Sequence, residues 1–443
     1  MCEDLIYDDQ ETSLGYMPSA RAQSPGRWRT PQLVSRFVAD EVDSALNRLA
    51  RDPTAASMRA VATAAPNATI QQLARLTQLL ANSGECLSQP SPEVVDIASS
   101  GGPGSLSTLL APLYARALGA RIAKVAVPGR PAGGLDVLAS LPGYESDLDA
   151  SGARRILDEC GYVHVEAGRA FCPLDAKFFI WRQTNGEQAV PNLAIASLLA
   201  KKVAAGVGRV VLDVRVGVHG NFGATKDDAT TNARRLIAVA SELGIRATCV
   251  LTCSEGVAQP WIGRGEALVA LSAVLSGTAE GALRTHADDC LRMARIATDT
   301  DNPAVNTLAL APAATAANDA MLAAHGASPD GFWSRQHDVA AAPRSPIAAD
   351  LTGWLQIDVA GIRRVLVDRQ RSSPPPISAR FPDPAGLKLE FFDSAAVTKG
   401  TVIALARDDR DPAHLAEQIS PHLLVRDRHM AAISQPRVEI IDG

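Results

Sequence analysis

The sequence predicts an α/β fold with a helical segment before it and a small β-rich segment after it. Short apolar runs alternate with helix-length stretches from Val94 onward, a pattern typical of βαβ units and a mostly parallel sheet. The chain has 443 residues, which is enough for two or three domains. Hydrophobic residues make up 47% of it and aromatic residues only 4%, so we expect helix–sheet layers filled by small aliphatic side chains.

The N-terminal part divides into a tail and helices. Residues 1–30 are rich in Ser, Pro, Arg and Gln and lack periodicity, so we expect a disordered tail. Helical spacing begins at Pro31, directly after the capping residue Thr30. A second helix, TIQQLARLTQLLANSG, ends at Gly84.

The strands of the predicted sheet come next. EVVDI is followed by the loop SSGGPGS and by a helix, and ARIAKVAVPG is the next strand. Buried strands are also predicted at 208–217 and 246–252, with a helix between them. The Ala-rich segment 285–348 favours helices, and the final segment, 346–443, favours a small domain of strands and helices.

Composition narrows the classes of partner. The net charge is −5 and no long basic run occurs, so we expect no nucleic-acid partner. Cys249 and Cys253 lie in an apolar run that favours buried thiols, and we expect no metal site. No apolar run is long enough to span a membrane and the polar N-terminus is not a secretory signal, so we expect a cytoplasmic protein.

The most informative stretch is WRQTNGEQAVPNLAIASLLAKK, which contains Arg182, Ser197 and Lys201. Ser197 and Lys201 are four residues apart and therefore share one face of a helix. A guanidinium, a hydroxyl and an ammonium together suit a planar ligand with carbonyl oxygens and an ionisable ring nitrogen. A pyrimidine base is such a ligand.

The same stretch resembles the base-recognition segment of thymidine phosphorylase and related pyrimidine nucleoside phosphorylases. In that family an Arg and a Ser-x-x-x-Lys-Lys motif hold the base, so the resemblance assigns base binding to Arg182, Ser197 and Lys201. Two further passages, LLAKKVAAGVGRVVLDVRVG and TGWLQIDVAGI, match the family in the same order along the chain.

The resemblance also implies an architecture. It predicts a helical base-binding and dimerisation domain built from 31–85 and 173–206. It places an α/β domain at 86–172 and 207–345, which faces the helical domain across a substrate cleft. The implied assembly is a homodimer.

The Gly-rich run DIASSGGPGSLST connects a predicted strand to a helix, a place where backbone N–H groups bind anions. The family has Asp-Lys-His-Ser-Thr-Gly-Gly-Val-Gly-Asp here, and its Lys and Ser residues bind phosphate. In this chain the Lys and His positions are Ile97 and Ala98. The residues that remain for an anion are Ser99, Gly101, Gly102, Gly104 and Thr108.

The second phosphate-binding segment of the family is also altered. Pro128 stands where the family has a phosphate-binding Ser, and a Thr is missing after Gly134. Losing the Lys and two hydroxyls would cost about 4–8 kcal/mol of phosphate affinity. The candidates for compensation are Arg130, Lys124 and His219.

The altered glycine loop is locally similar to that of anthranilate phosphoribosyltransferase, which binds the diphosphate of a phosphoribosyl donor. The sequence therefore predicts a pentosyltransferase that cleaves or forms the N-glycosidic bond of a pyrimidine nucleoside, with a degraded phosphate site. The alternatives are a nucleosidase, another glycosyl transfer on a specialised nucleoside, or a non-catalytic pyrimidine-binding relative. No cofactor is expected, and inorganic phosphate is a candidate co-substrate.

Overall fold

The computed structural model describes residues 31–101, 104–128, 131–187, 190–217, 222–253, 256–302, 304–374, 378–427 and 439–442, with side chains from residue 40 onward. The predicted tail, 1–30, lies outside the described residues.

The helices are α1 (Pro31–Arg51), α2 (Ala55–Ala64), α3 (Ile70–Ala81), α4 (Ser107–Ala117), α5 (Gly134–Leu138), α6 (Ala150–Cys160), α7 (Pro173–Thr184), α8 (Pro191–Ala204), α9 (Lys226–Glu242), α10 (Arg264–Leu275), α11 (Gly281–Thr298), α12 (Thr307–Ala324), α13 (Pro329–Ala341), α14 (Val359–Arg371) and α15 (Pro412–Ile419). The strands are β1 (Ser91–Ser99), β2 (Arg121–Ala126), β3 (Tyr162–Glu166), β4 (Val207–Val216), β5 (Arg246–Cys253), β6 (Trp261–Ile262), β7 (Arg344–Ala348), β8 (Gly353–Ile357), β9 (Ala385–Leu389), β10 (Ala396–Val397), β11 (Val402–Asp408), β12 (Leu423–Arg426) and β13 (Glu439–Asp442).

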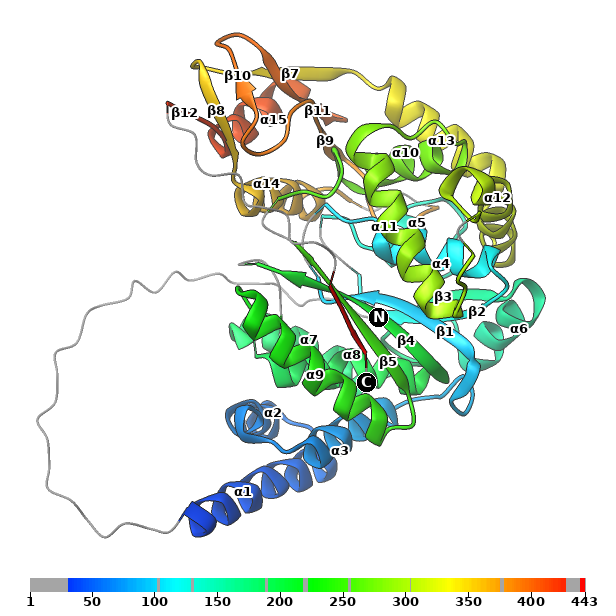
Figure 1. Ribbon diagram of the computed structural model, residues 1–443, viewed down its shortest axis with the longest axis vertical. Helices are drawn as coiled ribbons and strands as arrows, with labels where there is room; N and C mark the ends of the chain where they lie inside the picture. The colour runs from blue at the N-terminus through cyan, green and yellow to red at the C-terminus, as the bar shows by residue number, and fades with distance from the viewer. Residues whose placement is uncertain are drawn as a thin grey trace, which may run out of the picture.

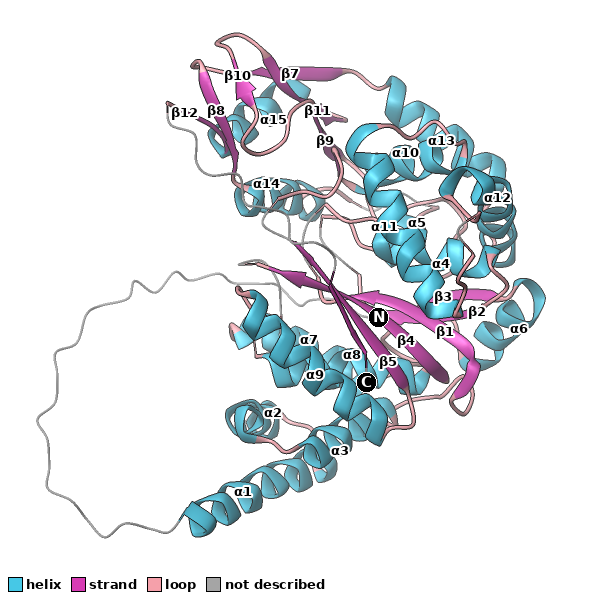
Figure 2. Ribbon diagram, in the orientation of Figure 1, coloured by secondary structure: helices cyan, strands magenta, loops and turns pink. Residues whose placement is uncertain are grey.

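A six-stranded sheet with the order β13-β5-β4-β1-β2-β3 forms the centre of the molecule (Figure 2). Its first five strands in the chain pair in parallel, as the alternating pattern predicts. The last strand, β13, pairs antiparallel with β5. The sequence places 439–442 in the C-terminal domain, and the structure corrects this. Ile441 is buried in the central core, and β13 covers the backbone edge of β5.

One face of the sheet carries the helices of the two predicted base-domain segments. In Figure 1, α7, α8 and α9 lie beneath the sheet, with α2 and α3 below them. The core residues of α2, α3 and α8 form one continuous apolar cluster with residues of β4 and β5. The C-terminal half of α8 lies directly on the sheet, because Lys202 forms an ion pair with Asp96 of β1. No open cleft separates the two at this contact.

The other face carries α4, α5 and the helices α10–α13, which share a second apolar cluster with Val95, Ile97 and Val211 of the sheet. Apolar residues therefore alternate along the strands between the two clusters, for example Leu212 and Val214 on one side and Val211 on the other. The central sheet is thus buried on both faces, as an all-parallel core requires.

The C-terminal segment packs around a third cluster, with the sheets β10-β8-β12 and β6-β9-β11-β7 and the helices α14 and α15. Strand β6 comes from the α/β segment and pairs with β9, so the C-terminal unit shares a sheet with its neighbour. Arg407 of β11 binds Glu266 of α10 through Nε (2.8 Å) and Nη2 (2.9 Å). These contacts hold the C-terminal unit against α10.

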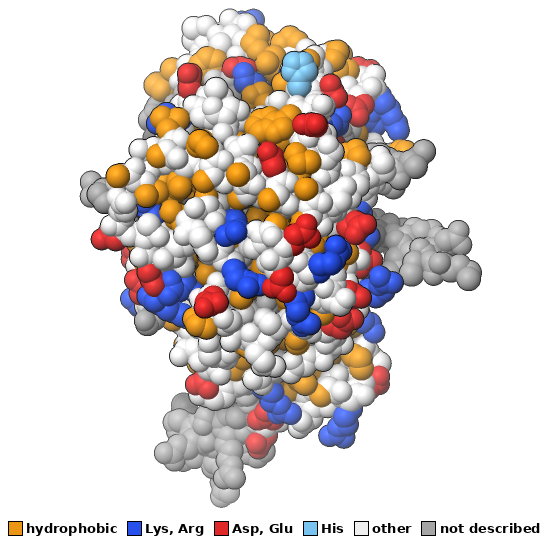
Figure 3. All heavy atoms as spheres, turned by 90° about the vertical axis from the view of Figure 1, so that its right-hand side faces the viewer, with side chains coloured by type: hydrophobic (Ala, Val, Ile, Leu, Met, Phe, Trp, Pro, Cys, Tyr) orange, Lys and Arg blue, Asp and Glu red, His pale blue; other side chains and the backbone are white. Residues whose placement is uncertain are grey.

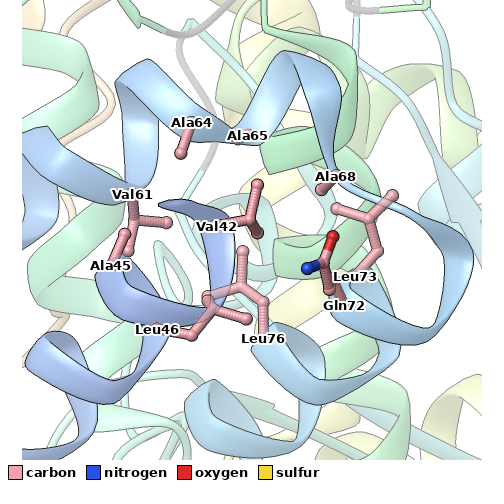
Figure 4. Close-up of a pocket in the computed structure, with 10 residues that line it drawn as sticks. All are labelled: Val42, Ala45, Leu46, Val61, Ala64, Ala65, Ala68, Gln72, Leu73 and Leu76. Carbon is pink, nitrogen blue, oxygen red and sulfur yellow. The ribbon is translucent and has the colours of Figure 1, made fainter. Parts of the chain in front are cut away.

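An apolar pocket lies among α1, α2 and α3 (Figure 4). Side chains such as Val42, Leu46 and Leu73 line it together with the amide of Gln72. Gln72 belongs to the N-terminal capping box of α3, in which its Oε1 accepts from the Thr69 N–H. None of the lining residues is a predicted site residue, and we interpret the pocket as a packing gap of the helical core.

Surface features agree with the compositional expectations. On the face shown in Figure 3, basic and acidic side chains are interspersed, and the described residues of that face form no extended patch of one sign. None of the helices in the described part of the chain combines the length and the apolar character that crossing a membrane requires.

Candidate functional site

The three predicted base-binding residues come together at the junction of α7 and α8. Arg182 lies in the last turn of α7, and Ser197 and Lys201 lie on one face of α8. They are only 4%, 6% and 5% exposed, respectively. Lys201 Nζ donates to Ser197 Oγ at 3.0 Å and to the Ser197 carbonyl oxygen at 2.7 Å. The structure therefore groups all three side chains in one buried site.

Asp175 completes this group. It lies two helical turns before Arg182 on α7, is 1% exposed, and forms an ion pair with Lys201. Its negative charge also acts on Arg182, where it opposes the effect of burial. One carboxylate is thus close to both cations, so it fixes the position of the Lys201 ammonium and reduces the repulsion between the two positive charges.

Arg182 is held by backbone carbonyls. Its Nε donates to Glu187 O and its Nη1 to Leu193 O, both at 3.3 Å. Burial lowers the pKa of the guanidinium, and the charges of Asp175 and Glu187 act in the opposite direction. These two hydrogen bonds are long, so a ligand carbonyl oxygen could replace them at small cost.

A second buried charge cluster lies next to the first, where α8 contacts the sheet. Asp96 of β1 forms ion pairs with Lys202 and, at 2.5 Å, with Lys124 of β2. Lys124 Nζ also donates to Ile97 O at 2.5 Å. Burial alone would raise the pKa of Asp96, but the charges and hydrogen bonds of the two lysines outweigh it and lower the pKa to about 2. Asp96 is therefore ionised.

The described part of the glycine loop follows β1 directly. Gly101 and Gly104 have φ angles of 99° and 69°, a region that favours glycine. At Gly104 a Cβ would come within 2.9 Å of Val257 Cβ, so the loop also requires glycine for close packing. Ser99 Oγ accepts from the Gly101 N–H at 3.2 Å.

The loop is attached to β4. Ser100 N donates to Asp213 O and Arg215 N donates to Ser100 Oγ, each at 2.9 Å. Ser107, the first residue of α4, donates from Oγ to Asp213 Oδ2 at 2.7 Å. On the opposite side, His286 Nε2 accepts from the Leu106 N–H at 2.8 Å. Burial, together with the charge of Arg215, lowers the pKa of His286 to about 4.

Thr108 lies at the first turn of α4 beside Gly134. A Cβ on Gly134 would come within 2.9 Å of His164 Cε1 and 3.1 Å of Thr108 O, so α4, α5 and β3 meet here at close range. Both ring nitrogens of His164 are buried without a hydrogen-bond partner in the described part of the chain. Burial lowers the pKa of His164 well below its usual value, and the charge of Lys124 acts in the same direction, so the ring is neutral.

The candidates for compensation differ in their surroundings. Lys124 is only 3% exposed and is paired with Asp96, so a role in anion binding would require this ion pair to open. Arg130, His219 and the loop residue Gly102 lie outside the described residues. Ile97 and Ala98, at the family's Lys and His positions, are buried in the two opposite core clusters.

Sequence reasoning missed Asp175, His164 and Arg215. The signal for Asp175 is its spacing of two helical turns from Arg182 in a predicted helix. The signal for Arg215 is a charge within the apolar strand 208–217, where an ionised residue needs a partner. His164 has a similar position in the short strand β3.

Within the described residues, no group of three His, Cys, Asp or Glu side chains could hold a metal ion. The chemistry of the site is therefore that of buried cations, hydroxyls and backbone N–H groups. Such groups bind and polarise anions and carbonyl oxygens.

Comparison with known proteins gives relatives for part of the chain. The thymidine phosphorylase of Mesorhizobium japonicum is 36% identical over 183 residues, which are 40% of this chain and 41% of that protein. The thymidine phosphorylase of Rhizobium meliloti is 34% identical over 182 residues, with the same two shares. The matched region thus spans less than half the length of these curated relatives.

No protein-family model matches the chain. Among solved structures, the anthranilate phosphoribosyltransferase of Thermus thermophilus aligns with a TM-score of 0.48 and 15% identity, covering 69% of this chain and 96% of that one. The sequence relatives share the name of the family that the base-binding motif resembles. The predicted resemblance to the thymidine phosphorylases is therefore confirmed over 40% of the chain.

Proposed function

We propose that this protein is a pentosyltransferase that cleaves or forms the N-glycosidic bond of a pyrimidine nucleoside. The observation that carries the proposal is the grouping of Arg182, Ser197 and Lys201 around the buried carboxylate of Asp175. Two cations and a hydroxyl in a buried site match the two carbonyl oxygens and the ring nitrogen of a pyrimidine. The similarity to the thymidine phosphorylases supports the same substrate class.

The site residues have distinct roles in this reaction. As the bond between C1′ and the base nitrogen breaks, negative charge develops on the base and positive charge on the sugar. Arg182 and Lys201 stabilise the negative charge of the departing base, and Ser197 fixes its orientation. Asp175 is a positioning residue, since it contacts Lys201 and holds the ammonium in place.

The second reactant comes from the side of the glycine loop. Asp96, which binds Lys202 beside Lys201, lies on β1 just before Ser99, so adjacent residues connect the base-binding group with the loop. In phosphorolysis, inorganic phosphate attacks C1′, a C–O bond forms, and the base leaves with a proton. The products are a free base and a sugar 1-phosphate.

A second candidate is transfer to water or to another acceptor. Ile97 and Ala98 are buried in the two cores, where they provide neither a cation nor an imidazole. This favours a nucleosidase, or a specialised nucleoside that brings its own phosphate, over ordinary salvage.

The test is chromatographic measurement of the free base released from uridine, thymidine, deoxyuridine and cytidine, with and without phosphate. Release that requires phosphate supports phosphorolysis, and release without phosphate supports the nucleosidase. Arg182→Lys keeps a cation but loses the planar fork, so we expect at least a roughly tenfold loss of kcat/KM. Binding of a pyrimidine with no release from any of the four nucleosides would favour a non-catalytic relative.

We further propose a homodimer formed through the helical segment that contains α1–α3, as the family resemblance implies. Light scattering coupled to gel filtration should give twice the chain mass. A single-chain mass at working concentration would contradict this proposal.

A further inference from the structure

We propose that Arg215 is the cation of a phosphate-binding site at the glycine loop, in place of the lysine whose position Ile97 occupies. The ligand class is a phosphate group, either free phosphate or the phosphate of a nucleotide. The identification of the anion rests on the proposed pentosyl transfer, whereas the site itself can be tested by direct binding.

The guanidinium of Arg215 is buried with two of its nitrogens unsatisfied. The residue is 2% exposed, and its Nε and Nη2 have no hydrogen-bond partner among the described residues. A buried, unpaired guanidinium is costly, because desolvation removes its hydration and no carboxylate replaces it. Such a group is retained at a site where an anion completes it.

Other buried cations of the protein differ in this respect. Lys124 and Lys202 share Asp96, and Lys201 binds Asp175. Arg264 donates to Asp136 at 2.8 Å. These four cations are therefore neutralised by the fold, whereas Arg215 forms no ion pair with any described carboxylate.

The position of Arg215 directs it to the glycine loop. Side chains alternate along β4, so Arg215 lies on the same face as Asp213, which contacts Ser107 at the start of α4. The backbone N–H of Arg215 donates to Ser100 within the loop. The charge of Arg215 also acts on His286, which accepts from Leu106 at the end of the loop. The guanidinium thus lies between the loop and α11.

Asp213 does not neutralise Arg215. Its Oδ2 accepts from Ser107 and its Oδ1 from Thr252, so both oxygens hold hydroxyls that connect α4 and β5 to β4. An arginine has a planar fork that binds two oxygens of a phosphate at once. With the N terminus of α4 and the Gly101 and Gly104 turns beside it, Arg215 supplies the charge that the altered loop lacks.

The experiment is isothermal titration calorimetry of the full chain with three probes: inorganic phosphate, uridine 5′-monophosphate and uridine. The variants are Arg215→Met, Arg215→Lys and the control Arg209→Met. Arg209 lies at the opposite end of β4, where it is paired with Asp299 at 2.6 Å. Thermal unfolding of each ligand-free variant provides a second readout.

We expect Arg215→Met to weaken phosphate or nucleotide binding about 10- to 100-fold and to leave uridine binding unchanged. Arg215→Lys should weaken it about tenfold, since it keeps the charge but loses the fork. Arg209→Met should bind like the wild type. The ligand-free Arg215→Met protein should unfold at a higher temperature than the wild type, because a buried unpaired charge is removed. A structural role for Arg215 predicts a lower temperature.

Binding of inorganic phosphate identifies a free co-substrate, and binding of the nucleotide alone identifies a phosphate carried by the substrate. Dependence on Arg215 in either case supports the site. Wild-type affinity in Arg215→Met overturns it, as does failure of the wild type to bind either anion. If Arg215→Met does not fold, unchanged affinity in Arg215→Lys overturns it. Phosphate binding that depends on Arg215 in a protein without uridine binding or turnover would leave the site standing and remove the proposed function.

Discussion

Two buried aspartates organise the cations of the base side. Asp175 binds Lys201, and Asp96 binds both Lys124 and Lys202. A buried charge pair does not by itself make a protein more stable, but removing one partner leaves the other charge unpaired and costs several kcal/mol. At the residue scale, the account therefore makes predictions for each aspartate.

The Lys201–Asp175 pair can be measured by a double-mutant cycle. Lys201→Ala leaves a buried carboxylate unpaired, so we expect a loss of about 3–5 kcal/mol in the free energy of unfolding. Lys201→Ala combined with Asp175→Ala should lose less than the sum of the single variants, and urea unfolding measures each value. Strict additivity would show that the two side chains do not interact.

Asp96 should make stability depend on acid pH. Its pKa falls from 3.8 to about 2 on folding, so its ionised form contributes about 2 kcal/mol at neutral pH. Because the folded-state pKa is depressed, this contribution is complete above the unfolded value and is lost as the pH falls toward the folded one. We expect the difference in unfolding free energy between wild type and Asp96→Asn to narrow from about pH 6 to about pH 2.5. A constant difference would contradict an ionised, paired Asp96.

At the element scale, the close approach of α4, α5 and β3 depends on Gly134. An alanine there would meet His164 Cε1 at 2.9 Å and the backbone oxygen of Thr108 at 3.1 Å. We expect Gly134→Ala to cost about 1–3 kcal/mol of folding free energy by overpacking, measured by urea unfolding. Gly256→Ala is the control, since a Cβ there meets nothing within 4 Å, and its effect should stay within about 0.5 kcal/mol. Equal effects would mean that the three elements are not tightly packed.

The elements show how far the sequence leads. The parallel strands and the helix that carries Ser197 and Lys201 could be predicted, because apolar periodicity and the spacing of four residues depend on local sequence. The return of β13 to β5 could not, since four residues of a strand carry no information on which sheet edge they join. The pairing of Lys124 with Asp96 likewise depends on contacts between distant segments.

At the scale of the whole molecule, a buried ion cluster joins the C-terminal unit to the α/β part. Arg407 binds Glu266 with two hydrogen bonds and Asp383 with one at 2.8 Å. Burial alone would raise the pKa of Glu266, but the Arg407 charge and hydrogen bonds outweigh it and lower the pKa. Glu266 thus stays ionised at the joint between the two units.

Arg407→Met leaves Glu266 and Asp383 without this partner, so we expect a loss of about 3–5 kcal/mol in unfolding free energy. Arg121→Met, which removes a surface pair with Asp158, is the control and should cost less than about 1 kcal/mol. Hydrogen exchange should show the greatest increase in β9 and β11. Equal losses in the two variants would refute a structural joint at Arg407.

The central claim is that the Arg182–Ser197–Lys201 group binds a pyrimidine whose glycosidic bond is cleaved. The most direct measurement is the rate of base release from uridine and thymidine by the wild type and by Ser197→Ala, which removes one hydroxyl and leaves the Lys201–Asp175 pair intact. The account predicts release by the wild type and a loss of about 10- to 100-fold in kcat/KM for Ser197→Ala, with little change in unfolding free energy. Equal rates for the two proteins, or no release by the wild type from either nucleoside, would contradict it.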